Sequence, residues 1–205
     1  MNNIIDTIVF DVGNVLLDWD PRHLYRQLIA DEREVEIFLS EICTPDWNVE
    51  QDRGRSWKTA TDELIEEHPE KAHLINAFDE RWEETITGPI AGSVDILRTL
   101  HSADVPLFSI TNFSAEKFPL VQKRYDFFDC FRDIVISGEE KTIKPHREIF
   151  QIFFERSGCR PQQCLFIDDS AANIDGAKAS GMEGHHFRTP EALASDLRNR
   201  GFPLD

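Results

Sequence analysis

Polar side chains suited to metal and phosphate chemistry follow directly on several short apolar runs of this chain. They are Asp11 after "IVF", Thr111 and Asn112 after "LFSI", Lys144 in the loop after "DIVIS", and Asp168 and Asp169 after "LFI". Apolar runs of this length are typical of buried parallel strands. Because an open parallel sheet binds its ligands at the carboxyl ends of its strands, we expect these side chains to converge on one crevice.

The chemistry of the set is complementary. Two carboxylates held close together repel unless a cation lies between them, and hard oxygen ligands suit Mg²⁺. A lysine adds positive charge, while a threonine hydroxyl and backbone N–H groups can hold phosphoryl oxygens. An ionised aspartate can then attack phosphorus. Each residue alone also fits an ordinary turn or helix cap, but together they predict an enzyme that forms an aspartyl phosphate.

The elements that must position these residues follow from periodicity. Strands are predicted at 4–10, 105–110, 134–136, 164–167 and, more weakly, 185–187; helices are predicted at 93–100, 146–157, 171–180 and 190–200. Strands that alternate with helices are typical of a parallel sheet. The predicted fold class is therefore α/β, with a Rossmann-like parallel sheet core.

Residues 21–88 interrupt that alternation, because they show several helical patterns and no convincing strand. We interpret them as an all-helical insertion, with residues 1–20 and 89–205 forming the α/β core. Asp20 followed by Pro21 marks the start of its first helix. Three tryptophans, Trp47, Trp57 and Trp82, are interpreted as the core of the insertion, because aromatic residues at helical spacing usually pack.

Composition excludes several classes of function. The formal net charge of −16 and the pI of about 4.8 argue against a nucleic-acid partner, which requires a basic face. No apolar run approaches the roughly 18 residues of a membrane span, and the N-terminus lacks the pattern of a signal peptide. The four cysteines lack paired or zinc-binding spacing and are interpreted as reduced thiols. We therefore expect a cytoplasmic protein without a membrane partner; its oligomeric state stays open.

Four segments in order, "FDVGNV", "ITN", "IKP" and "FIDDSAANIDGA", resemble the four motifs of the haloacid dehalogenase superfamily. The helical insertion after the first motif resembles the mobile cap domain of that superfamily, so the resemblance spans essentially the whole chain. Within the superfamily the chain is most similar to the branch that includes bacterial α-glucose-1-phosphate phosphatases and the N-terminal phosphatase domain of soluble epoxide hydrolases.

The resemblance implies a role for each matching residue and Mg²⁺ as the cofactor. Asp11 would be the nucleophile and a metal ligand, the Gly13 carbonyl the second ligand and Asp169 the third; Thr111 and Asn112 would bind the phosphoryl group; Lys144 would neutralise both Asp11 and the phosphate; Asp168 and Asn173 would orient the surroundings of the metal. The implied function is Mg²⁺-dependent hydrolysis of a phosphomonoester on a small phosphorylated metabolite.

One position departs from the family pattern. Most phosphatases of this superfamily carry a second aspartate two places after the nucleophile, as general acid and base, and here that place is Gly13. General acid help is worth about 10²–10⁴ in rate. Either the substrate has a good leaving group, such as the anomeric oxygen of a sugar 1-phosphate or an acyl oxygen, or a residue such as Asp18, Asp20, His23 or another from the cap supplies the proton.

Two other functions remain open at this stage. A 2-haloacid dehalogenase would use the same aspartate on carbon without a metal, but the acid pair Asp168 and Asp169 disfavours it, since such a site gains little from extra negative charge. A catalytically weakened protein that binds a phosphorylated metabolite is suggested by Gly13 alone.

Overall fold

The computed structural model describes residues 5–204. Its strands are β1 (Thr7–Phe10), β2 (Leu17–Trp19), β3 (Ile86–Pro89), β4 (Leu107–Thr111), β5 (Asp133–Ile136), β6 (Cys164–Asp168) and β7 (Glu183–His186). Its α-helices are α1 (Arg22–Leu28), α2 (Glu32–Glu41), α3 (Pro45–Asp52), α4 (Trp57–Glu67), α5 (Ala72–Glu80), α6 (Ala91–Ser102), α7 (Phe118–Arg124), α8 (Ser137–Glu140), α9 (Arg147–Ser157), α10 (Ala171–Ala179) and α11 (Pro190–Asn199). Short 3₁₀ turns are η1 (Pro69–Lys71), η2 (Trp82–Thr85), η3 (Asp126–Cys130) and η4 (Pro161–Gln163).

The main sheet has five strands in the order β5-β4-β1-β6-β7, and every neighbouring pair is parallel. The predicted α/β class with a parallel core is confirmed. All five strands predicted for the sheet are present, although their observed ends differ by up to three residues; Ile4, the predicted start of the first strand, lies outside the described residues. β1 is central and fully buried, so the residue that follows it emerges at the middle of the carboxyl edge.

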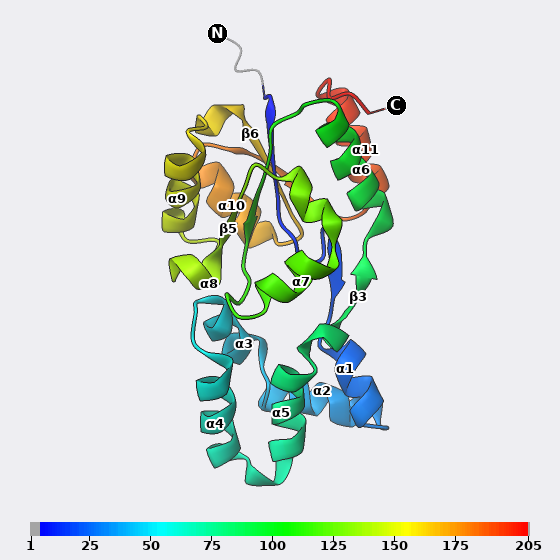
Figure 1. The fold of residues 1–205 in the computed structure, drawn as a ribbon, viewed down its shortest axis with the longest axis vertical. Coiled ribbons are helices and arrows are strands. Elements are labelled where there is room, and N and C mark those ends of the chain that lie inside the picture. Colours follow the sequence, from blue (N-terminus) through cyan, green and yellow to red (C-terminus); the bar gives the residue numbers. More distant parts are fainter. Residues whose placement is uncertain (1–4, 205) are drawn as a thin grey trace.

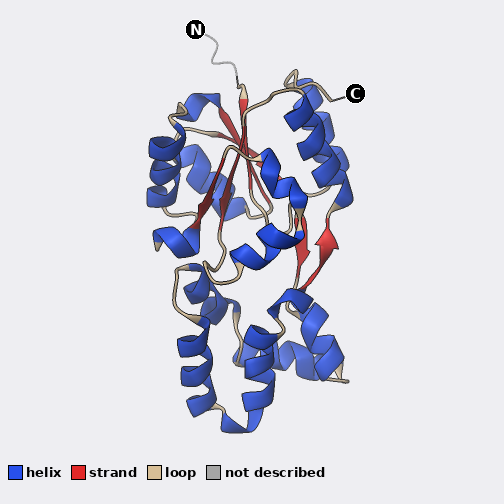
Figure 2. Cartoon of the chain, viewed as in Figure 1, coloured by secondary structure: helices blue, strands red, loops and turns tan. Residues whose placement is uncertain are grey.

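Side-chain alternation along the strands produces the two helical layers (Figure 1, Figure 2). In β1, Ile8 and Phe10 point to the face covered by α6, α7 and α11, while Val9 points to the face covered by α9 and α10. In β6, Leu165 points to the first of these faces and Phe166 to the second. Apolar residues on both faces of a strand are the reason the predicted strands read as continuous apolar runs.

Helices α1 to α5 lie together beyond the carboxyl edge of the sheet (Figure 1). The chain enters and leaves this group through β2 and β3, which pair antiparallel with Leu17 opposite Pro89. The prediction of no strand within residues 21–88 was therefore wrong, because β3 begins at Ile86. Its sequence, "ITGP", has no strand periodicity, and it is extended because it pairs with β2 far away in the sequence.

The tryptophans of the insertion divide into two sets. Trp47 and Trp57 pack against each other and against Phe78 of α5, as predicted. Helix α5 ends at Glu80, however, and Trp82 packs its ring against Phe113, which follows β4 of the core, at 5.4 Å between centroids. Trp82 is thus part of the contact between insertion and sheet.

The cysteines are all free, as predicted. Among residues 5–204, no helix is both long enough and apolar enough to cross a membrane.

Helix α10 approaches the segment that carries Lys144 closely at Gly176. A Cβ atom at this position would lie 2.6 Å from the Pro145 carbonyl oxygen and 3.1 Å from Pro145 Cα. Such distances are below van der Waals contact, and the obstacle is backbone. Glycine at 176 therefore sets the spacing between α10 and the Lys144 loop.

We expect Gly176→Ala to lower the free energy of unfolding by about 1–2 kcal/mol, measured by urea denaturation. Because the obstacle is backbone, the steric cost lies in the upper part of the usual range for overpacking, at about 2–3 kcal/mol, and exceeds the roughly 1 kcal/mol that alanine adds to helix propensity. Asp175→Ala, at the neighbouring exposed position of α10, is the matched control and should leave stability unchanged or raised. A Gly176→Ala protein as stable as wild type would show that this contact imposes no constraint.

Candidate active site

The carboxyl edge of the sheet brings the predicted site residues together. Asp11 directly follows β1, Thr111 ends β4, Asp168 ends β6 and Asp169 follows it. Lys144 reaches the same place from the loop after α8, and its side chain is fully buried. The convergence expected from the sequence is therefore present in the fold.

Lys144 lies between two carboxylates. Its Nζ is 2.8 Å from Asp11 Oδ1 and 2.7 Å from Asp168 Oδ2. Asp11 Oδ1 also accepts a hydrogen bond from the backbone N–H of Val12 at 2.7 Å. No residue of 5–204 donates to the other oxygen, Oδ2. The Asp11 carboxylate is thus fixed by one oxygen and presents the other.

Asp168 is held from the opposite side. Its Oδ1 and Oδ2 accept hydrogen bonds from Asn173 Nδ2 at 3.0 and 3.1 Å, and Oδ1 also accepts from the backbone N–H of Ser170 at 2.8 Å. With Lys144 on Oδ2, this carboxylate is fully engaged. The role predicted for Asp168 and Asn173 is to orient the surroundings of the metal. The contact that the structure shows is with Lys144: Asn173 holds Asp168, and Asp168 in turn holds Lys144.

The site carries more negative than positive charge. Burial raises the pKa of Asp11 well above its usual range, and Asp168 and Asp169 add to the rise while Lys144 opposes it. Burial, followed by the Asp168 charge, also raises the pKa of Asp169. Burial works to lower the pKa of Lys144, but the two carboxylates beside it outweigh burial and raise it. One ammonium therefore does not balance the three acids.

A divalent cation fits this imbalance. Carboxylate oxygens of Asp11, Asp168 and Asp169 lie within 4.8 Å of one another. Hard oxygen donors in excess of nearby cations are the ligands that Mg²⁺ selects. Gly13, whose carbonyl oxygen is predicted to bind the metal, lies in the turn after Asp11 and forms an isolated β-bridge with Leu17.

Thr111 and Asn112 differ in what their side chains do. Thr111 Oγ1 is buried and has no hydrogen-bond partner among residues 5–204, so a phosphoryl oxygen would satisfy it. Asn112 is already engaged: its Oδ1 accepts from the Lys144 backbone N–H at 2.8 Å, and its Nδ2 donates to the Lys144 carbonyl at 3.1 Å. Asn112 therefore positions Lys144, a role that sequence reasoning missed, and only its second amide hydrogen is left for a phosphoryl group.

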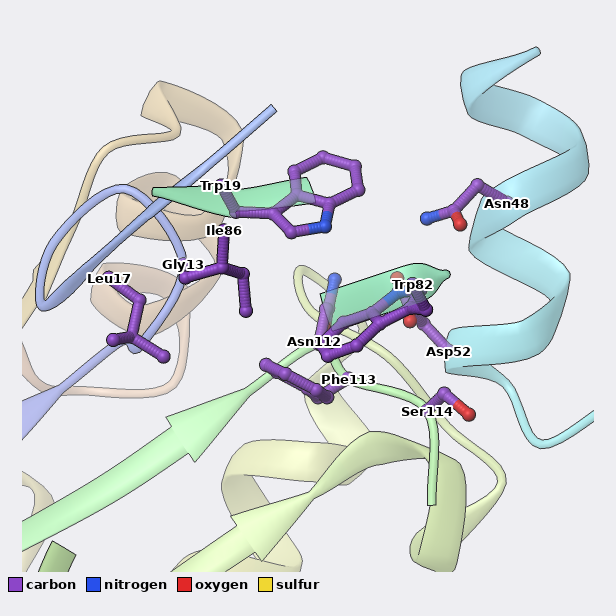
Figure 3. Close-up of a pocket in the computed structure, with 10 residues that line it drawn as sticks. All are labelled: Gly13, Leu17, Trp19, Asn48, Asp52, Trp82, Ile86, Asn112, Phe113 and Ser114. Atoms are coloured by element: carbon purple, nitrogen blue, oxygen red, sulfur yellow. The ribbon is translucent and has the colours of Figure 1, made fainter. Parts of the chain in front are cut away.

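A pocket of about 90 Å³ opens beside this site, between the sheet and the helical insertion (Figure 3). Gly13 lines it two residues after Asp11, and Asn112 lines it directly after Thr111, so it adjoins the place where a phosphoryl group would lie. Most of the rest of its wall is apolar or aromatic. The ten lining residues are Gly13, Leu17, Trp19, Asn48, Asp52, Trp82, Ile86, Asn112, Phe113 and Ser114.

Asp52 is the one titratable side chain among those ten residues. It lies at the end of α3 and reaches into the pocket beside Trp82 (Figure 3). Burial raises its pKa to about 7, against the opposing effects of Lys144 and the Ser114 backbone N–H. Nothing in the local pattern "VEQDRGR" distinguishes this aspartate from the other acids of the insertion, so sequence reasoning did not single it out.

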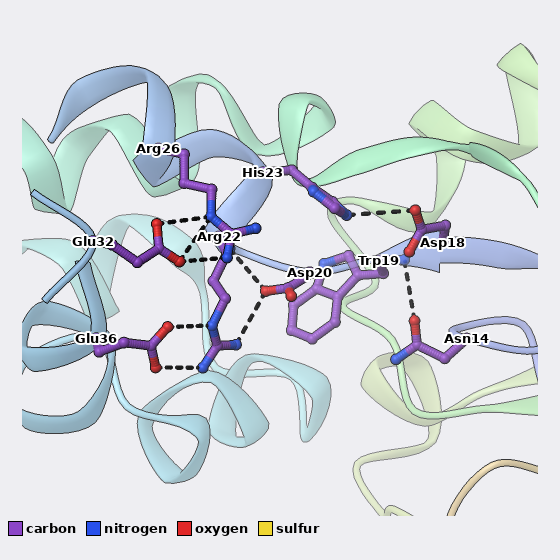
Figure 4. A network of polar contacts seen from close by, with 9 residues as sticks. All are labelled: Asn14, Asp18, Trp19, Asp20, Arg22, His23, Arg26, Glu32 and Glu36. Carbon is purple, nitrogen blue, oxygen red and sulfur yellow. Dashed lines mark hydrogen bonds and ion pairs between the residues drawn. The ribbon is translucent and has the colours of Figure 1, made fainter. Parts of the chain in front are cut away.

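The three named candidates for a cap acid are held elsewhere. Asp20 accepts hydrogen bonds from the Arg22 backbone and side chain. His23 Nε2 lies 3.5 Å from Asp18 Oδ2, and Asp18 also accepts from Thr87. Figure 4 shows them within a surface network that continues to Arg26, Glu32 and Glu36, and none of the three lines the pocket beside Gly13.

Comparison with known proteins finds similarity to haloacid dehalogenase-like hydrolases and to phosphatases. A family model described as haloacid dehalogenase-like hydrolase matches residues 5–181. The chain is 25% identical over 193 residues to a sesquiterpene phosphatase of Aspergillus oryzae, covering 93% of each. It is 34% identical over 90 residues to a phosphoglycolate phosphatase of Escherichia coli, covering 42% of this chain and 34% of the relative. The structure of a HAD family enzyme of Bacteroides thetaiotaomicron, in complex with magnesium and inorganic phosphate, has the same fold, with a TM-score of 0.71, 23% identity and coverage of 90% of this chain and 95% of that one.

We expect Lys144→Met to lower the free energy of unfolding at neutral pH by about 3–5 kcal/mol, because it leaves the buried Asp11 and Asp168 carboxylates without their shared cation. Urea denaturation without added divalent metal measures the loss. Lys58→Met is the control: its side chain is 83% exposed and its ion pair with Asp62 is worth at most about 1 kcal/mol. Equal losses in the two variants would contradict the structural role of Lys144.

We expect the stability advantage of Asp52→Asn over wild type to grow by on the order of 2 kcal/mol between pH 5 and pH 8. The folded-state pKa of Asp52, about 7, lies above that of an unfolded aspartate. The ionised carboxylate therefore destabilises the fold, increasingly as pH rises from about 4 and levelling off above about 7, whereas asparagine stays neutral. Urea denaturation at both pH values measures the difference; an advantage that does not change with pH would show that the carboxyl is not desolvated.

Proposed function

Because the chain belongs to the haloacid dehalogenase-like hydrolases, we propose that it is a Mg²⁺-dependent phosphomonoester hydrolase that forms a phosphorylated Asp11 as its intermediate. The observation that carries the proposal is the Asp11 carboxylate itself. Its Oδ1 is fixed by Lys144 and by Val12, and its Oδ2 has no partner among the described residues. A carboxylate held in this way is aimed for nucleophilic attack.

The surrounding residues supply the remaining roles. Asp11 and Asp169, with the Gly13 carbonyl, would hold Mg²⁺, which supplies positive charge to offset the repulsion between carboxylate and phosphate. Lys144 adds a cation at the same point, and the buried Thr111 hydroxyl binds a phosphoryl oxygen. Asp168 acts on Lys144 rather than on the substrate.

The comparisons support phosphate as the group that is bound. Two relatives are named phosphatases, and a protein of the same fold holds magnesium together with inorganic phosphate. For the substrate we propose a small phosphorylated metabolite whose leaving group turns an apolar face toward Trp19 and Trp82. Sugar 1-phosphates have such an apolar face in the C–H groups of the pyranose ring. Their anomeric oxygen also leaves readily, as expected of the leaving group because of Gly13. This agrees with the resemblance to the α-glucose-1-phosphate phosphatase branch.

The domain assignment follows from this function. We assign residues 1–20 and 89–205 to the catalytic core and residues 21–88 to a cap that encloses the leaving group, with the correction that the cap ends in strand β3. Four unpaired cysteines suit a reducing compartment, and we place the protein in the cytoplasm.

A 2-haloacid dehalogenase is the rival within the same family. Its carboxylate substrate would enter a site that already carries an excess of negative charge from Asp168 and Asp169 and would be repelled. A bound Mg²⁺ would offset this repulsion, but the dehalogenase reaction proceeds without a metal, whereas phosphate transfer uses one. The charge of the site therefore favours phosphate transfer.

We expect metal-dependent phosphate release from a panel of sugar 1-phosphates, sugar 6-phosphates and p-nitrophenyl phosphate, with Asp11→Asn lowering the rate by about 10³-fold or more because the nucleophile is lost. EDTA should remove the activity and Mg²⁺ restore it. Asp95→Asn, an exposed acid on α6, is the matched control and should retain full activity. Chloride release from 2-chloropropionate in EDTA, with no phosphate release from the panel, would instead establish the dehalogenase.

A further inference from the structure

Gly13 stands at the position where most phosphatases of the superfamily carry their general acid, so the core provides no carboxyl there. An alcohol leaving group departs slowly unless a proton reaches its oxygen. The attacking and leaving oxygens lie roughly in line at phosphorus. A leaving group displaced by Asp11 therefore departs on the side away from the carboxyl end of β1, where the pocket lined by Gly13 and Asn112 begins. The proton must come from a group on that pocket wall.

We propose that Asp52, at the end of α3 in the cap, is the general acid that protonates the leaving oxygen, and the base that activates water afterwards. This inference rests on the proposed function of the site. It assigns a catalytic role to a residue outside the family motifs and explains how the chain can dispense with a carboxyl at position 13.

The pocket wall supports the assignment. Of its ten residues, Asp52 alone carries a titratable side chain. The others are apolar, aromatic or amide- and hydroxyl-bearing, and no charged residue of the wall pairs with Asp52. The cation that interacts with the Asp52 carboxyl is Lys144 of the core, which lowers its pKa but does not outweigh burial. A carboxyl in such surroundings is protonated to a large extent at neutral pH, which is the state an acid requires.

Contacts across the boundary between cap and core hold Asp52 in place. Ser137 Oγ, directly after β5, donates to the Asp52 carbonyl at 2.6 Å and accepts from the Phe113 backbone N–H at 2.9 Å. Two residues further on, a Cβ atom at Gly54 would lie 2.6 Å from the Gly138 carbonyl oxygen, so the segment after Asp52 packs directly on the core backbone. The backbone that carries Asp52 is thus fixed by the same core loops that surround the phosphoryl site.

The steps balance. Asp11 Oδ2 forms a bond to phosphorus as the bond to the leaving oxygen breaks, and that oxygen takes the proton of Asp52 and departs as an alcohol. The Asp52 carboxylate then takes a proton from a water molecule whose oxygen attacks the phosphorus of the aspartyl phosphate. Inorganic phosphate leaves, Asp11 is again a carboxylate and Asp52 is again protonated.

Two substrates with an aromatic ring test the role. The leaving oxygen of p-nitrophenyl phosphate needs no proton, whereas that of benzyl phosphate, an alkyl alcohol, does. The ratio kcat/KM reports the steps up to loss of the alcohol and excludes the later water attack. We expect Asp52→Asn to lower kcat/KM for benzyl phosphate by about 10²–10⁴-fold and for p-nitrophenyl phosphate by less than about 10-fold.

Two further variants complete the design. Asp46→Asn removes an exposed acid from the same helix and should change neither substrate. Gly13 lines the same pocket, and a Cβ atom built there meets nothing within 4 Å, so the backbone leaves room for a side chain to begin at this position. We expect Gly13→Asp in the Asp52→Asn protein to restore at least 10-fold of the lost benzyl phosphate activity.

The outcomes separate the two proposals. An equal loss on both substrates, no loss on either, or a wild-type enzyme that cleaves p-nitrophenyl phosphate but not benzyl phosphate would overturn the role of Asp52 and leave the phosphatase standing. No metal-dependent phosphate release by the wild type from any substrate would overturn the proposed function and this inference with it. Circular dichroism of each variant verifies folding, and asparagine keeps the shape of the side chain it replaces.

Discussion

The buried contact of Lys144 with Asp11 and Asp168 is the interaction on which the rest of the site depends. An ammonium with no exposed surface is tolerated only because two carboxylates and a precise backbone setting compensate its lost hydration. Three separate parts of the core provide that setting. The pairing of β1 with β6 brings the two acids side by side, and the Asn112 side chain forms hydrogen bonds with both the N–H and the carbonyl of Lys144. Helix α10 packs closely at Gly176, and its Asn173 holds Asp168.

The same cluster explains why the site seeks cations. Its charges do not cancel, because Asp169 adds a third carboxylate. Burial raises the pKa of Asp11 and of Asp169, so the ionised form of both is held against its preference for water or a counter-ion. In a purely structural cluster this excess would be a defect. Here it is the condition for binding a divalent cation and, through that cation, a phosphate that the acidic surface of the protein would otherwise repel. Stability is given up where binding is needed.

The sequence predicted the sheet and the residues at its carboxyl edge because both depend on local pattern and on one general property of parallel sheets. Thr111 and Asp168 end their strands and Asp11 and Asp169 follow theirs directly, so predicting that they meet required no knowledge of loops. The rest depends on contacts between distant segments. The β2–β3 pair, the Asn112 grip on Lys144 and the entry of Asp52 into the pocket join residues separated by at least 30 positions, and no local periodicity encodes such pairings.

In the proposed mechanism, the residues predicted from local pattern act on phosphate, whereas the residue placed by distant contacts transfers protons. The groups that we propose bind and attack phosphorus are fixed within the core by hydrogen bonds and ion pairs that do not involve the cap. The group that we propose handles protons belongs to the cap and reaches the pocket only through contacts such as Ser137 with Asp52 and Trp57 with Ser114. Movement of the cap would therefore leave phosphate binding intact while withdrawing the proton donor. A substrate whose leaving group fills the space between Trp19 and Trp82, as we propose, would stabilise the arrangement in which the acid is in place, and recognition of the leaving group and its protonation would then be one event.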